Sequence, residues 1–93
     1  MLIGKVIGTA IATLKDRRLE GLKLLLVAEA NAEGQITGIP FIAADLIGAG
    51  VGELVMLVEG STAQRSTNGE NVPVDAAVIG ILNSIDYESA VNH

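Results

Sequence analysis

Short runs in which apolar residues dominate or alternate with polar ones recur along the chain, a pattern typical of β-strands. Glycine, charged residues and polar turns separate the runs, which cover 2–13, 21–30, 35–46, 53–59 and 75–85. The leucine-rich second run also fits a helical period, but Gly21 before it and the turn at 31–34 favour a strand. Pro40 interrupts the third run and suits a sheet edge or a bulge.

One face of the first run is small throughout. Its glycines, Gly4 and Gly8, predict strong coiling or the close approach of another backbone. That face comprises Leu2, Gly4, Val6, Gly8, Ala10 and Ala12.

Five strands joined by short turns predict an all-β fold, a small five-stranded β-barrel similar to an oligonucleotide-binding (OB) fold. Ser61 is suited to cap a short helical turn over 62–66. We expect a single domain over 1–88 and a flexible tail over 89–93.

Composition changes the picture because a chain this small leaves much of its surface exposed. Of 93 residues, 49% are hydrophobic, and Phe41 and Tyr87 are the only aromatic ones. Several strands are apolar on both faces, so one face can fill a barrel while the other needs a different partner. Since large exposed apolar patches mark interfaces, the composition predicts self-association.

Charge is unevenly distributed along the chain. Residues 1–23 hold five basic residues against two acidic ones, a net of +3, whereas 24–93 hold one basic residue against nine acidic ones, a net of −8. The acidic total of −5 argues against nucleic acid as a partner. A basic edge meeting an acidic edge of a second copy would fix the register of assembly, while two solvated faces remain the alternative.

Localisation follows from what the sequence lacks. The N-terminus shows no signal-peptide pattern, and no uncharged apolar run approaches the roughly 18 residues of a membrane span. Without cysteine, disulfides, thiolate chemistry and zinc–sulfur sites are excluded. We therefore expect a cytoplasmic protein that does not enter the membrane.

A dense group of glycines, Gly48, Gly50 and Gly52, lies between the third and fourth runs. A phosphate-binding G-x-G-x-x-G fingerprint would need glycine at Glu53, whose carboxylate would repel phosphate, and no Gly-Lys-Ser/Thr follows. A tight turn, or a place where subunits meet backbone to backbone, fits better.

Catalytic candidates are few, so we expect no enzyme, no cofactor and no metal site. His93 is the only histidine and the last residue. No pair of the carboxylates Asp45, Glu53, Glu59 and Asp75 is indicated to converge, and solvated faces or turn contacts explain them better. An OB-like module that binds a small anionic ligand or an oligonucleotide is the alternative function, although stacking aromatics and a basic groove are missing.

Five segments together resemble the EutN/CcmL family, the vertex proteins of bacterial microcompartments and carboxysomes. They occur in one order over nearly the whole chain: IGKVIGT (3–9), KDRRLEGLKLLLV (15–27), ADLIGAGVGE (44–53), VEGS (58–61) and PVDAAVIGI (73–81). The resemblance implies a cyclic pentamer of small β-barrels at the fivefold corners of a protein shell, with hexameric shell proteins tiling the facets. Such a ring needs an interface that closes after five steps.

The resemblance also suggests where contacts lie. We expect Gly48, Ala49, Gly50, Val51, Gly52 and Glu53 at a subunit interface near the ring axis, and Arg17, Arg18, Ser61 and Arg65 at subunit or facet contacts. Two departures affect these contacts. Arg17 stands where the family has proline, and Gln64 stands at the family's arginine position, with Arg65 one residue later.

Overall fold

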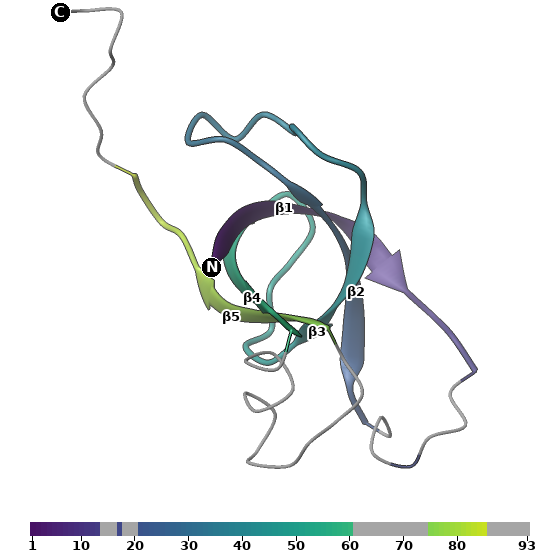
Figure 1. The fold of residues 1–93 in the computed structure, drawn as a ribbon. Coiled ribbons are helices and arrows are strands. Elements are labelled where there is room, and N and C mark those ends of the chain that lie inside the picture. Colours follow the sequence, from purple (N-terminus) through teal and green to yellow (C-terminus); the bar gives the residue numbers. More distant parts are fainter. Residues whose placement is uncertain (14–16, 18–20, 61–74, 86–93) are drawn as a thin grey trace, which may run out of the picture.

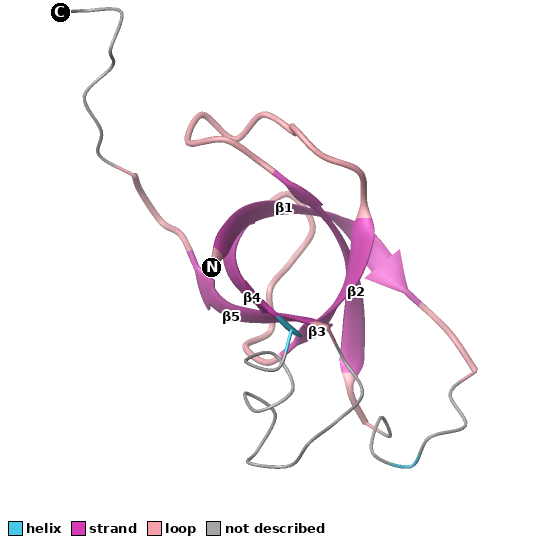
Figure 2. Cartoon of the chain, in the orientation of Figure 1, coloured by secondary structure: helices cyan, strands magenta, loops and turns pink. Residues whose placement is uncertain are grey.

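The computed structural model describes residues 1–13, 17, 21–60 and 75–85, and these residues form a closed β-barrel (Figures 1 and 2). The strands are β1 (Leu2–Ala10), β2 (Lys23–Glu29), β3 (Phe41–Asp45), β4 (Leu54–Glu59) and β5 (Ala76–Ile81). Their order around the barrel is β1-β2-β3-β5-β4, and β4 pairs back with β1. Only the β3–β5 pair is parallel. The expected all-β barrel is confirmed, whereas the helical turn expected over 62–66 lies outside the described residues.

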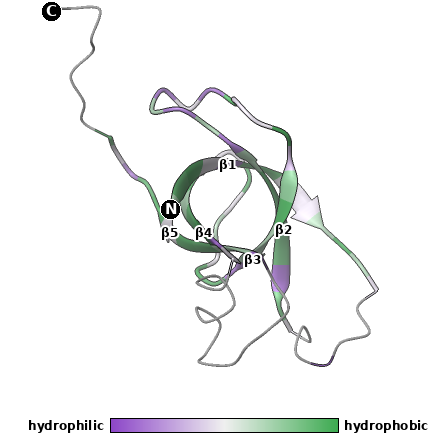
Figure 3. Cartoon of the chain, viewed as in Figure 1, coloured by the Kyte–Doolittle hydropathy of each residue, from purple (hydrophilic) through white to green (hydrophobic). Residues whose placement is uncertain are grey.

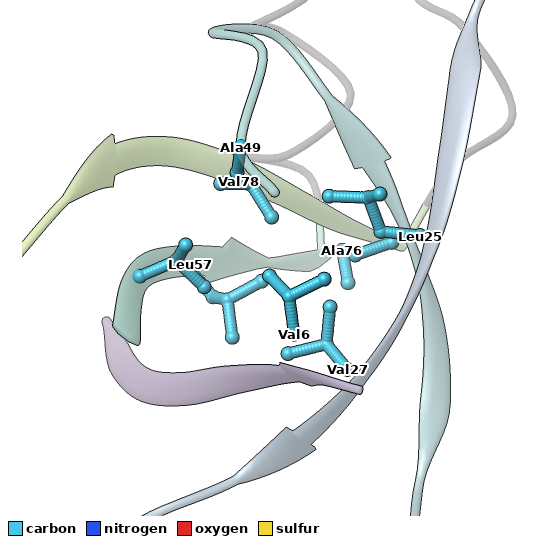
Figure 4. Close-up of a cluster of buried hydrophobic side chains, with 9 residues drawn as sticks. Val6, Leu25, Val27, Ala49, Leu57, Ala76 and Val78 are labelled. Carbon is cyan, nitrogen blue, oxygen red and sulfur yellow. The ribbon is translucent and has the colours of Figure 1, made fainter. Parts of the chain in front are cut away.

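The barrel interior is filled by alternate residues of each strand, as the two-residue period of a strand requires. Valine, leucine and alanine fill it, because the space within so small a barrel admits few large side chains. Figure 4 shows how these side chains meet. The buried cluster consists of Val6, Leu25, Val27, Ala43, Ala49, Val55, Leu57, Ala76 and Val78.

Gly4 of β1 is required by this packing. A β-carbon there would clash with Leu57 Cδ1 and lie 2.6 Å from Val27 Cγ1, closer than real contacts allow. The sequence therefore signals a close approach correctly, but side chains of β2 and β4 make it rather than a backbone.

A register shift in β1 corrects the predicted small face. Val6 pairs with Val27, and the next recorded pair joins Gly8 to Leu26, so Ile7 is the extra residue of a β-bulge. The bulge reverses the alternation, and Gly8 lies on the outer side with Leu26 rather than on the inner side with Val6. The prediction of one continuous face over 2–12 is wrong beyond Val6.

The third predicted strand is much shorter than expected. Residues 30–40 form a loop between β2 and β3, with one isolated bridge between Ala30 and Ile36, and only Phe41–Asp45 is a strand. The side chain of Asn31 binds backbone amides of this loop, and such local bonds compete with strand pairing. Pro40 directly precedes β3.

The outer side of β1, β2 and β3 is apolar where the three strands lie side by side. Leu26 pairs with Gly8 on one side and with Ile42 on the other, and Leu24 likewise lies between Ala10 and Ala44. Figure 3 shows the barrel strands as mostly hydrophobic. We call Gly8, Leu24, Leu26 and Ile42 the outer apolar face. Among the described residues, no helix has the length and hydropathy needed to cross a membrane.

Candidate functional site

The loop between β3 and β4, residues 46–53, crosses one end of the barrel (Figure 1). Ala49 from this loop is fully buried and joins the core cluster, and Figure 4 shows it beside Val78. The predicted contact residue Ala49 is therefore a core residue of its own chain. Its burial fixes the middle of the loop against the barrel.

The first half of the loop is organised by the carboxylate of Asp45, the last residue of β3. Asp45 Oδ1 accepts hydrogen bonds from the backbone amides of Ile47 (3.1 Å), Gly48 (3.0 Å) and Ala49 (3.2 Å). Only 8% of Asp45 is exposed. Charged acceptors make stronger hydrogen bonds than neutral ones, so one buried oxygen fixes three consecutive amides. Of the two alternatives that the sequence offered for Asp45, a solvated face or a turn contact, the structure shows the turn contact.

Lys23 at the start of β2 provides the opposite charge. The antiparallel register places Lys23 directly beside Asp45, and its Nζ lies 3.5 Å from Asp45 Oδ2. The same ammonium donates a hydrogen bond to the carbonyl of Ala49 (3.3 Å). The lysine side chain is 52% exposed, so its charge stays partly hydrated while it meets the buried carboxylate. Asp45 Oδ2 accepts no hydrogen bond from the described residues.

The second half of the loop is tied to its own end and to β1. The amide of Gly50 donates to Glu53 Oε1, and the amide of Glu53 donates to the carbonyl of Gly50 (3.2 Å). The amide of Gly52 donates to the carbonyl of Val6 (2.7 Å), whose own amide donates to the carbonyl of Glu53 (3.0 Å). One oxygen of the expected interface residue Glu53 is therefore used inside the chain.

The three glycines of the loop differ in why they are needed. Gly48 and Gly52 have positive φ values of 80° and 93°, which disfavour a side chain whatever the space around them. Gly50 has no such angle, and a β-carbon there would meet only Glu53 Oε1, at 3.2 Å. Turn geometry thus accounts for Gly48 and Gly52, whereas at Gly50 the nearest described atom is the Glu53 carboxylate oxygen that its own amide binds.

The loop presents apolar side chains outward. Ile47 is 40% exposed and Val51 is 64% exposed. A β-carbon at Gly48 or Gly52 would have no atom of the described residues within 4 Å, so none of these residues covers the backbone there. This backbone, flanked by exposed isoleucine and valine, can form a flat apolar contact.

Four further candidate residues come from other parts of the sequence. Arg17 is exposed, and Arg18, Ser61 and Arg65 lie outside the described residues. Among the residues described, no three His, Cys, Asp or Glu side chains form a group that could hold a metal. Lys23 was missed by the sequence analysis, because its proximity to Asp45 depends on the register between β2 and β3.

Comparisons with known proteins agree on one family. The family model described as ethanolamine utilisation protein EutN/carboxysome matches residues 1–83. The shell vertex protein GrpN of Rhodospirillum rubrum is 41% identical over 86 residues, which is 92% of this chain and 97% of GrpN. The carboxysome shell vertex protein CcmL of Nostoc is 43% identical over 89 residues, 95% of this chain and 88% of CcmL.

Two solved structures have the same fold. GrpN, described as a pentameric microcompartment shell protein, superposes with a TM-score of 0.83 at 39% identity, covering 94% of this chain and all of that one. The structure of Nostoc CcmL gives a TM-score of 0.86 at 43% identity, covering 95% of this chain and 93% of that one.

Proposed function

The chain belongs to the EutN/CcmL family, and on this basis we propose that it is a structural shell protein that assembles as a ring of five. The ring occupies the fivefold vertices of a bacterial microcompartment shell in the cytoplasm. The observation that carries this proposal is the likeness to pentameric GrpN, at 39% identity over nearly the whole of both chains.

A physical reason connects the ring of five with the vertex. A flat layer of hexagonal units cannot close on itself, and fivefold points supply the missing curvature. Each subunit of a closed ring meets its neighbours through two different surfaces, one on either side. The described residues offer two apolar surfaces that suit this requirement.

We propose that the first of these surfaces is the β3–β4 loop, through Gly48 and Gly50–Glu53 with the exposed side chain of Val51, whereas the side chain of Ala49 is buried in its own chain. The second is the outer apolar face of β1–β3, where Ile42 is exposed. The support is the exposure of Val51 on the loop and of Ile42 on the outer apolar face, where Leu24 and Leu26 are partly exposed. Arg17, Arg18, Ser61 and Arg65 are kept as proposed subunit or facet contacts.

Three finer proposals follow from family membership. Hexameric shell proteins are the proposed neighbours of the ring, because a vertex needs facets to join. We further propose that the chain has no catalytic role and that residues 1–88 act as one domain. The support is the naming of relatives as shell vertex proteins and a family match over 1–83.

The direct test of the ring is a native mass measurement of the purified chain over a range of concentrations. Five copies are expected. A chain that stays monomeric at micromolar concentration would contradict the proposal.

The vertex role is tested by co-expression with a hexameric shell protein, with and without this chain, followed by electron microscopy. Closed particles are expected only when the chain is present, and open sheets or tubes without it. Equal numbers of closed particles in both preparations would rule out a vertex role.

A further inference from the structure

We propose that Asp45 is a positioning residue for assembly, which holds the β3–β4 loop in the shape that contacts the next subunit. Lys23 assists it by linking the Asp45 carboxylate to the carbonyl of Ala49. The inference rests on the proposed function, because it takes this loop as a ring contact.

The geometry assigns the role to one oxygen atom. Asp45 Oδ1 accepts hydrogen bonds from three consecutive amides at 3.0–3.2 Å, those of residues 47–49. Without this acceptor all three amides need another partner. Water can reach the partly buried amides of Ile47 and Gly48, but the amide of Ala49 is buried, and a buried donor without a partner is costly. Ile47, which projects outward from the same turn, would lose its fixed position together with them.

Lys23, on the neighbouring strand β2, contacts both the Asp45 carboxylate and the β3–β4 loop. Its Nζ lies 3.5 Å from Asp45 Oδ2 and 3.3 Å from the Ala49 carbonyl, so it contacts both the carboxylate and the loop that the carboxylate binds. A buried carboxylate is stable only when it is paired or well hydrogen-bonded. Lys23 thus permits a charge to serve as the acceptor at this place.

A preformed loop favours assembly because ordering of the contact is completed before association. A flexible loop loses conformational entropy when it becomes ordered during association, and this loss weakens binding. A loop that is already rigid in the free subunit avoids the loss at that step. Loss of the Asp45 acceptor should therefore weaken the ring through the loop, while the barrel stays closed through its strand pairing.

The test compares Asp45→Ala, Asp45→Asn, Lys23→Met and Lys23→Arg with the wild type and with Asn31→Ala. Asparagine keeps an acceptor at Oδ1 without the charge, and arginine keeps the charge of Lys23. Asn31 binds amides of the other long loop and serves as the matched control. Two quantities are measured, hydrogen exchange at the amides of residues 47–49 and the protein concentration at which half of the rings dissociate.

In the Asp45→Ala variant, we expect the amide hydrogens of residues 47–49 to exchange about tenfold faster or more than in the wild type. The protein concentration at which half of the rings dissociate should rise by about tenfold or more. Asp45→Asn should lie between Asp45→Ala and the wild type. Its amide protons at residues 47–49 should also shift upfield, because the acceptor is neutral. Lys23→Arg should restore most of what Lys23→Met loses, and Asn31→Ala should leave both quantities unchanged.

Several results would overturn the inference. Unchanged exchange in both Asp45 variants would show that the carboxylate does not hold the loop. Faster exchange with unaltered ring dissociation would show that the loop shape does not matter for assembly. Equal effects of Asp45→Ala and Asn31→Ala on the rings would indicate general destabilisation. Failure of the proposed function itself would be recognised separately, because the wild type would then form no ring.

Discussion

The two long loops on either side of β3 begin in the same way and end in different environments. In the β2–β3 loop, Asn31 Oδ1 accepts hydrogen bonds from the amides of Glu33 (3.1 Å) and Gln35 (2.9 Å). In the β3–β4 loop, Asp45 Oδ1 accepts them from the amides of residues 47–49. Both loops thus use a side-chain oxygen at the end of a strand, or two residues beyond it, to fix the turn that follows.

The two side chains, Asn31 and Asp45, differ in their exposure to solvent and in their charge. The hydrogen bonds of Asn31 are exposed, so water can replace each of them. The carboxylate of Asp45 is buried, paired with Lys23, and followed by Ala49 in the barrel core. The comparison teaches that the same local chemistry carries more weight where water cannot substitute for it.

The largest expected difference between the loops is their importance for ring assembly, which valine substitutions at one glycine of each loop would measure. Gly50 and Gly38 both lack a positive φ, and a β-carbon at either would meet its nearest atom at 3.2 Å. We expect Gly50→Val to abolish the ring and leave a folded barrel, because a branched side chain would hold the neighbouring chain away. Gly38→Val should keep the ring. Native mass and circular dichroism measure the two properties, and a ring that survives Gly50→Val would remove the loop from the contact.

The second difference concerns stability. Asp45→Ala leaves three amides without their acceptor and should lower the free energy of unfolding by about 2–4 kcal/mol. Asn31→Ala should cost about 0.5–1 kcal/mol, because water replaces the lost bonds. Urea unfolding at one fixed protein concentration gives both values, since assembly also contributes to stability. Equal losses would mean that burial does not distinguish the two loops.

A third and smaller difference concerns exposed apolar side chains. Val51 of the β3–β4 loop is 64% exposed and Ile36 of the β2–β3 loop is 50% exposed. Val51→Asp should raise the concentration for half-dissociation by about tenfold, because a charge would be buried in the contact. Ile36→Asp should change it little. Sedimentation over a dilution series measures both, and the opposite ranking would place the contact on the β2–β3 loop.

The smallest expected difference is between alanine substitutions at one glycine of each loop, which should lower stability by nearly the same amount. These substitutions test the backbone conformation alone. Gly34 and Gly48 have φ values of 83° and 80°, one in each loop. Alanine at either position should cost about 1 kcal/mol, since the left-handed conformation is unfavourable for any side chain. None of the described residues crowds a β-carbon at Gly48. A clearly larger loss of ring stability for Gly48→Ala would show that this backbone also meets the next subunit.

Much of the barrel could be predicted from the sequence, because the strand pattern is local. The two-residue period of β4 and the apolar run of β5 place Leu57 and Val78 within strands, where the structure has them. The bulge at Ile7 could not be predicted, since pairing with β2 decides it. Residues 35–40 were predicted as part of the third strand, because Ile36 and Ile39 imitate the strand pattern, but the structure has only one isolated bridge there, between Ala30 and Ile36.

The candidate site, like the barrel, has features that the sequence predicted and features that it could not predict. The three glycines predicted either a tight turn or a meeting of subunits after the third apolar run, and the structure shows the turn. The separate reasons for Gly48 and Gly50 needed backbone angles, and the partnership of Lys23 with Asp45 needed strand register. The role of Gly48–Glu53 in subunit contact stays a prediction.

By itself, the sequence determined that the chain forms short strands, turns at its glycine-rich loop and resembles one family. Those properties arise from residue spacing and backbone preference, which act over a few neighbouring residues. Only the tertiary structure decided that Ala49 enters the core, that Gly4 has no room for a side chain, and that Asp45 meets Lys23. Each of these depends on residues far apart in the chain, which closure of the barrel brings together.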